Sequence, residues 1–144
     1  VFDPNGVEVT HQGALDPHTP VTHGWLRASH RKLDEDLSLP FRPFHTHDEK
    51  QPLTPGEIYE LDIEIWPTSI VVPANWTIAL TIQGHDYQYS DTVEQVGWFT
   101  MTGVGPFKHD DPSDRPRDLF DGKVTLHFDG GRESFVLVPI IPPR

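Results

Sequence analysis

The sequence has 144 residues, including 15 Pro and no Cys, and its formal net charge is −11. This length predicts one domain over residues 1–144, and the Pro density argues against long helices because each interior Pro removes a backbone hydrogen bond. The composition excludes a nucleic-acid binder, which needs positive charge, a membrane-spanning helix, which needs about 18 consecutive apolar residues, and a disulfide or thiol protein.

The chain opens with a hairpin signal. In "VFDPNGVEV" the stretch "DPNG" at residues 3–6 predicts a turn, since Pro fixes φ and Gly accepts a positive φ. Val1 and Phe2 are therefore expected to end one strand, and residues 7–9 to begin its partner. A domain rarely starts at the end of a strand, so we expect one or more N-terminal strands to be missing from this chain.

Period-2 alternation of apolar and polar side chains is the main signal in the rest of the chain. It predicts strands over residues 58–66, 76–83 and 123–128. A turn at "DGG", residues 129–131, leads into an apolar strand at 134–141, and weaker strands are expected at 23–29 and 97–102.

Two long segments interrupt this pattern. Residues 30–56 are rich in Pro and polar side chains, and residues 84–122 hold one expected helical turn, "RPRDLF" at 115–120. Together the elements predict an all-β fold, a jelly-roll β-sandwich of antiparallel strands with long Pro-rich loops.

A catalytic serine is not expected. Serine hydrolysis needs a nucleophile on a sharp turn such as G-x-S-x-G, and none of the Ser residues has that setting. We therefore predict no catalytic residue and no cofactor in this chain.

Three histidine and acidic residues are weak metal candidates. "HTHDE" would place His45, His47 and Glu49 on one face of an extended segment. The metal-binding jelly rolls called cupins also carry His-x-His followed by a Glu, but their Glu comes several residues later than Glu49 does here. The flanks "PFRPF" and "KQPLTPG" are typical of a loop, so we expect loop histidines without metal. Likewise "HDD" at 109–111 with Asp114 lacks the regular spacing of a calcium loop.

Aromatic residues leave a carbohydrate-binding module open as an alternative. The candidate platforms are Trp66, Trp76, Trp98, Tyr87 and Tyr89. Trp76 lies on the apolar face of its predicted strand, so its default role is core packing.

The stretch "GWLRASHRKLDED" at residues 24–36 concentrates basic and aromatic side chains in an acidic protein. Arg suits interfacial ion pairs because its guanidinium is planar and weakly hydrated. We predict domain-interface roles for five residues: Trp25, Arg27, His30, Arg31 and Lys32. The alternative is pairing within the chain to the acidic residues at 34–36.

The same stretch resembles the C-terminal domain of the X-Pro dipeptidyl-peptidase and cocaine-esterase family of serine hydrolases. The resemblance continues through "PFRPFHTHDEKQPLTPGEIYELDIEIWPTS", "DDPSDRPRDLFDGKVTLH" and "LVPIIPP". It implies a jelly-roll domain packed on an upstream α/β-hydrolase domain that holds the whole catalytic triad. One departure is "IVVPANWTIALTIQ" at 70–83, where the family has a more basic strand.

These observations predict a non-catalytic accessory domain of a serine hydrolase that braces the catalytic domain, walls the substrate cleft and supports oligomers. Self-association through exposed strand edges is also expected. The absence of Cys fits a cytoplasmic protein, and the sequon at residues 75–77 would matter only in a secreted one. The alternatives are a free-standing carbohydrate-binding jelly roll and a cupin-like metal protein.

Overall fold

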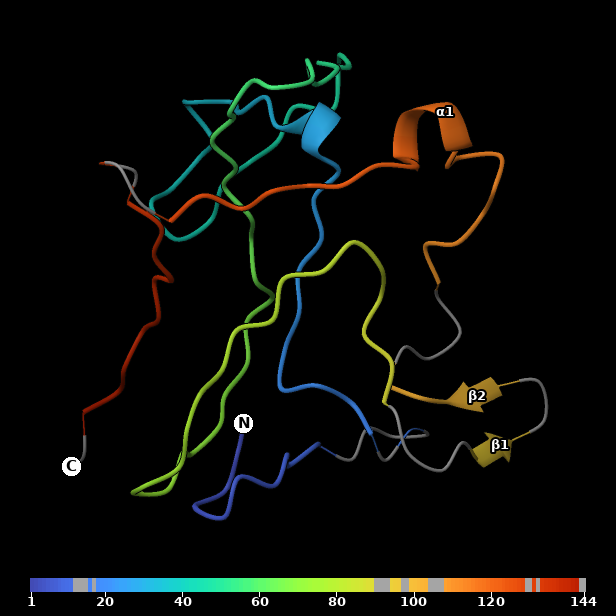
Figure 1. Cartoon of the computed structure of the whole chain (residues 1–144). Helices are drawn as coiled ribbons and strands as arrows, with labels where there is room; N and C mark the ends of the chain where they lie inside the picture. The colour runs from blue at the N-terminus through green and yellow to red at the C-terminus, as the bar shows by residue number, and fades with distance from the viewer. Residues whose placement is uncertain are drawn as a thin grey trace.

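The computed structural model describes residues 1–11, 16, 18–89, 94–96, 99–103, 108–128, 131 and 133–142. These ranges contain four short elements, shown in Figure 1: the 3-10 helix η1 (Ala28–His30), the strands β1 (Glu94–Val96) and β2 (Phe99–Met101), and the helix α1 (Arg117–Phe120). The two strands pair antiparallel. No helix among the described residues is long and apolar enough to cross a membrane.

The N-terminal hairpin is confirmed. Phe2 and Glu8 are antiparallel bridge partners, and the turn between them closes when the amide of Gly6 donates to the carbonyl of Asp3 at 3.0 Å. Gly6 has a φ of 79°, which a residue with a Cβ rarely adopts. Phe2 also exchanges two backbone hydrogen bonds with Thr77, at 2.9 and 3.0 Å, so the hairpin is tied to the middle of the chain.

Residues 58–66 and 76–83, both predicted strands, run in opposite directions on either side of a turn (Figure 1). The amide of Trp76 donates to the carbonyl of Pro73 at 3.2 Å, and Asn75 takes a left-handed φ of 67°. Within the described residues these two segments form no regular strand, and Thr77 alone makes a bridge. The jelly-roll sandwich therefore stays a prediction.

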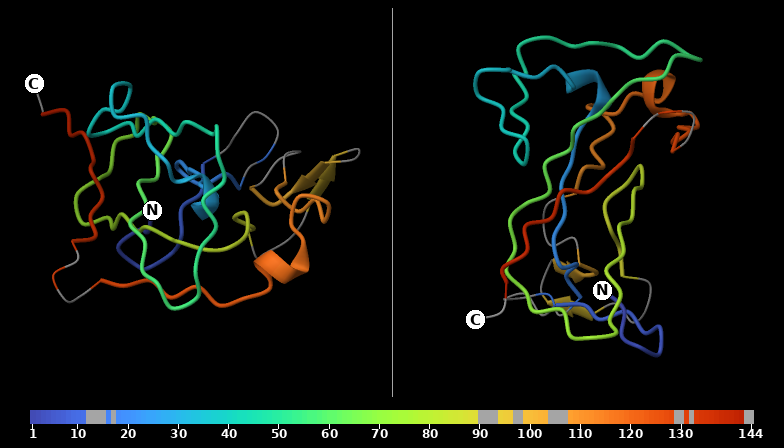
Figure 2. Two further views of the ribbon diagram at one scale, coloured as in Figure 1. Left: turned by 90° about the horizontal axis from the view of Figure 1, so that it is seen from above. Right: turned by 90° about the vertical axis from the view of Figure 1, so that its left-hand side faces the viewer.

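Residues 22–24 lie against residues 64–66, as Figures 1 and 2 show. The amide of Trp66 donates to the carbonyl of His23 at 3.0 Å. Gly24 is needed here, because a Cβ at this position would lie 1.9 Å from the carbonyl oxygen of Glu64. This close approach brings two segments about 40 residues apart into one surface.

A second set of contacts joins Asp16 and His18 to the residues after β2. The buried carboxylate of Asp16, 6% exposed, accepts hydrogen bonds from the amides of Gly103 at 2.6 Å and His18 at 2.8 Å. The His18 ring stacks on Tyr89, with 4.1 Å between the centroids. A buried carboxylate that accepts two amides is satisfied, so this tie is structural.

The apolar residues of the alternating segments are not enclosed. In the described part of the chain no large side chain is fully buried. Nine residues predicted to form apolar faces are each more than a third exposed: Leu61, Ile63, Ile65, Ile78, Leu80, Ile82, Val124, Leu126 and Phe128. Apolar faces of this extent are usually covered by another layer of protein.

Three local predictions can be compared with the elements. The helical turn expected at 115–120 is confirmed by α1, and part of the weak strand at 97–102 is confirmed by β2, while residues 97 and 98 lie outside the described ranges. The strand predicted at 23–29 is wrong at its end, because the His30 amide bonds to the Arg27 carbonyl at 2.7 Å and starts η1. Residues 129 and 130 of the "DGG" turn are also outside those ranges.

Candidate functional site

Asp86 connects three distant segments at the centre of the candidate site. Its carboxylate accepts hydrogen bonds from the Trp25 indole at 3.1 Å, the His109 ring at 2.8 Å and the His109 amide at 2.7 Å. The Asp86 side chain is only 12% exposed. Burial alone would raise the pKa of Asp86, but the hydrogen bonds from His109 and Trp25 outweigh it and hold the pKa below its usual range.

Four aromatic rings gather around this carboxylate. The ring of Trp25 lies 4.2 Å from His23, 5.2 Å from Trp66 and 5.3 Å from His109 between centroids. Trp25 and Trp66 meet edge to face, at 82°. Burial lowers the pKa of His23, although the nearby Asp86 raises it in part, so this ring favours its neutral form.

Arg27 is paired within the chain. Its two terminal nitrogens contact the two carboxylate oxygens of Asp114, at 3.1 and 2.5 Å, and its guanidinium lies 5.2 Å from the Phe120 ring centroid. The hydrogen bond to Asp114 raises the pKa of Arg27 and lowers that of Asp114. The bidentate pair fixes the loop that precedes α1 onto residues 24–30.

Arg31 and Lys32 also have partners in this chain. Arg31 donates to the carbonyls of Ala28 at 3.1 Å and Gln51 at 2.6 Å, and its guanidinium lies 4.3 Å from the Tyr59 ring centroid. Lys32 donates to Asp48 at 3.0 Å. Internal pairing, the alternative to an interface, therefore occurs, but with acids other than those at 34–36. The interface role of residues 25–32 stays a prediction.

The metal candidates lie near one another without forming a ligand set. The His47 ring centroid lies 6.1 Å from that of His45 and 5.5 Å from that of His30. Glu49 is engaged elsewhere, accepting from Gln51 at 2.9 Å and lying 3.6 Å from Lys32. In the ranges that the structure describes, no three His, Cys, Asp or Glu residues are placed to hold a metal ion.

A cavity of about 690 Å³ lies beside these residues and brings most of them together. Several of the residues that line it were candidates in the sequence analysis. Glu64 was not identified there as a site residue, and Asp114 was not identified as the partner of Arg27. Eleven of the described residues line the cavity: Trp25, Leu26, Arg27, His30, Pro43, Phe44, His45, His47, Glu64, Trp66 and Asp114. Of the aromatic platforms considered for sugar binding, Trp66 lies here, while Trp98 is outside the described residues.

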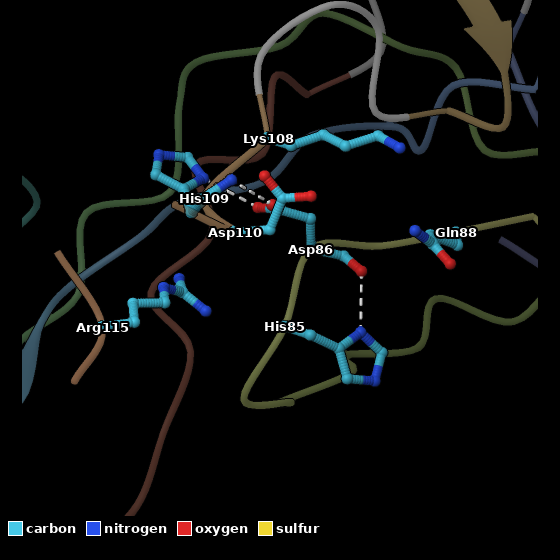
Figure 3. Close-up of a pocket in the computed structure, with 7 residues that line it drawn as sticks. All are labelled: His85, Asp86, Gln88, Lys108, His109, Asp110 and Arg115. Atoms are coloured by element: carbon cyan, nitrogen blue, oxygen red, sulfur yellow. Dashed lines mark hydrogen bonds and ion pairs between the residues drawn. The ribbon is translucent and has the colours of Figure 1, made fainter. Parts of the chain in front are cut away.

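A smaller cavity of about 250 Å³ has Asp86 in its lining. Figure 3 shows Asp86 held by His109, and the His85 ring turned back toward the Asp86 carbonyl, at 2.8 Å. Lys108, Asp110 and Arg115 complete a wall of mixed charge. Among the residues that the structure describes, no Ser lines either cavity.

Comparison with known proteins gives the family. The sequence matches the model of the X-Pro dipeptidyl-peptidase C-terminal non-catalytic domain over residues 2–137. Two curated relatives, from Mycobacterium bovis and Mycobacterium tuberculosis, both carry the name "putative serine esterase". Each is 37% identical over 71 residues, covering 46% of this chain but only 11% of the relative. No solved structure matches. The match over residues 2–137 confirms the resemblance found in the sequence, and the chain belongs to the family of X-Pro dipeptidyl-peptidase C-terminal non-catalytic domains.

Proposed function

We propose that this chain is the accessory domain of a serine hydrolase, packed on a catalytic α/β-hydrolase domain of the same polypeptide. The observation that carries the proposal is the family match over residues 2–137. The esterase names of the two relatives support the reaction class of the parent. In this proposal the domain folds as a jelly-roll sandwich, braces the catalytic domain, walls part of its substrate cleft and supports oligomers.

The exposed apolar residues support a packed partner. Leu61, Ile63 and Ile65 follow one face of the segment 58–66, and each is more than a third exposed. At about 25 cal/mol per Å², covering such side chains supplies most of the free energy of a domain interface. Trp25, 45% exposed, adds an aromatic side chain of the kind that concentrates in interfaces.

Hydrogen–deuterium exchange of the isolated chain and of the parent protein tests the packing. We expect slower exchange in the parent for peptides covering 24–32, 58–66 and 76–83, because these amides would be covered. Peptides from the exposed loop at 34–42 serve as the internal control and should exchange alike in both. Equal exchange of all these peptides in the two proteins would contradict the packing.

Labelling with a fluorophosphonate tests whether the catalytic Ser lies in the parent protein outside this chain. The parent should be labelled at one Ser and hydrolyse p-nitrophenyl acetate, while the isolated chain should show neither behaviour, since none of its Ser residues stands in a G-x-S-x-G setting. Stoichiometric labelling of the isolated chain would show that it carries its own nucleophile and would overturn the accessory role.

A further inference from the structure

The cavity of about 690 Å³ combines aromatic rings with charged side chains, and this chemistry points to a ligand of its own. Trp25 and Trp66 form an edge-to-face pair in its wall, and Phe44 adds a third ring. All three rings are exposed, Trp66 at 57%, Trp25 at 45% and Phe44 at 44%, so they offer apolar surface to a ligand that enters. A concave site lined with aromatic rings favours a flat or apolar group.

Among the carboxylates of the wall, Glu64 is the one without a partner. Arg27 and Asp114 neutralise each other through their two-point contact. Glu64 is half-buried, and among the described residues no hydrogen bond or ion pair joins its carboxylate to another side chain. A cation placed beside this unpaired carboxylate would gain Coulomb energy, so Glu64 favours a positively charged ligand.

His45 also lines this wall, but its ring is held from behind by the backbone. Its Nε2 lies 2.9 Å from the carbonyl oxygen of Asp62, and because a carbonyl only accepts, Nε2 carries the proton. In the neutral ring Nδ1 is then an acceptor, and this atom is buried without a partner in the structure. Because Nδ1 has no exposed surface, the acceptor that this wall offers to a ligand is the Glu64 carboxylate, whereas its strongest donor, Arg27, is already occupied by Asp114.

We propose that this cavity binds a primary ammonium group carried on an aromatic or alkyl body, with Glu64 as the counter-ion and Trp66 and Trp25 against the body. A primary ammonium brings three N–H donors and a positive charge, which match an unpaired carboxylate and aromatic faces. A neutral sugar would supply hydroxyl donors but leave the charge of Glu64 uncompensated. The net charge of −11 also attracts cations to the chain.

The proposed site goes beyond the accessory role, because it binds a small ligand and because all of its named residues are present in the isolated chain. Isothermal titration calorimetry of the 144-residue chain at pH 7.5 with benzylamine, benzyl alcohol and benzoate tests how affinity depends on the charge of the ligand, since the three ligands have similar shapes. We expect benzylamine to bind about tenfold or more tightly than the alcohol, as one hydrogen bond to a charged group provides, and benzoate not to bind. Equal affinities for amine and alcohol would overturn the proposal.

Two pairs of variants locate the binding. Glu64→Gln should lower the affinity for benzylamine about tenfold, while Glu60→Gln, an exposed residue on the same face of the same segment, should leave it unchanged. Trp66→Leu should weaken binding of amine and alcohol together, with Trp76→Leu, which lines neither cavity, as its control. Should Glu64→Gln fail to fold by circular dichroism, full retention of affinity in Trp66→Leu would overturn the proposal.

A neutral hexose and an oligosaccharide panel complete the test. Binding of a sugar without binding of the amine would assign the cavity to carbohydrate and overturn the ammonium site. The outcome does not depend on exchange protection in the parent, so the two proposals fail separately. Loss of amine binding in Glu64→Gln with unchanged docking would support both.

Discussion

Removal of the Asp86 carboxylate should loosen the centre of the molecule. Asp86→Ala deletes three hydrogen bonds, to the Trp25 indole and to the ring and amide of His109, at 2.7–3.1 Å. A hydrogen bond to a charged group contributes about 1.5–3 kcal/mol, but the donors of Trp25 and His109 are partly exposed and regain water, so we expect a loss of about 2–4 kcal/mol in the free energy of unfolding. In a chain of this size that lowers Tm by roughly 6–16 °C.

Thermal unfolding by circular dichroism measures the effect. Asp110→Ala is the matched control, because Asp110 is an exposed carboxylate in the wall of the same small cavity and should change stability by less than about 0.5 kcal/mol. The pKa of Asp86 lies below its usual value, so its contribution is present above about pH 4 and is lost as pH falls through the folded-state pKa. A Tm for Asp86→Ala equal to that of Asp110→Ala at pH 7 would refute the reasoning.

Three further predictions concern packing, acid stability and association. Gly24→Ala should lower the free energy of unfolding by about 3 kcal/mol or more, since its Cβ would lie 1.9 Å from the Glu64 carbonyl oxygen. Gly84→Ala, with open space around it, should be tolerated, and chemical denaturation compares the two variants. Burial lowers the pKa values of His23 and His30 below 6.5, so their contribution to stability should be fully present above that pH and should be lost as the pH falls below it. His23→Gln should therefore reduce the difference in Tm between pH 7.5 and pH 5.5, and an unchanged difference would contradict this. The isolated chain should self-associate more as salt screens its charge of −11, and light scattering from a monomer at both low and high salt would contradict this.

Local features of the fold could be predicted from the sequence. The "DPNG" turn and the helical turn in "RPRDLF" depend on residues a few positions apart, and both are present as the first hairpin and α1. The contacts of Phe2 with Thr77 and of His23 with Trp66 could not be predicted. Alternation shows which side chains share a face, but it does not show which segment lies alongside.

In the candidate site, too, individual residues could be identified from the sequence but their distant partners could not. Trp25 and Arg27 stood out in the sequence because of their local density, yet the partner of Arg27 is Asp114, 87 residues away. The nearer Asp34 is unavailable because its carboxylate accepts the amides of its own turn, at 3.0 Å each. Trp66 did carry a signal, since it lies on the otherwise acidic face of the segment 58–66, where a large aromatic residue has no packing reason to be.

That segment also explains how one stretch of chain can serve two purposes. The even-numbered Glu64 and Trp66 line the cavity and the odd-numbered Leu61 and Ile63 do not, as expected where side chains alternate along an extended backbone. The proposed ammonium site and the proposed docking face therefore lie on opposite sides of the same backbone. Ile63→Ala should weaken protection of the segment in the parent without changing benzylamine affinity, and Glu64→Gln should do the reverse. A variant of either kind that changed both measurements would show that the two faces are coupled through the backbone.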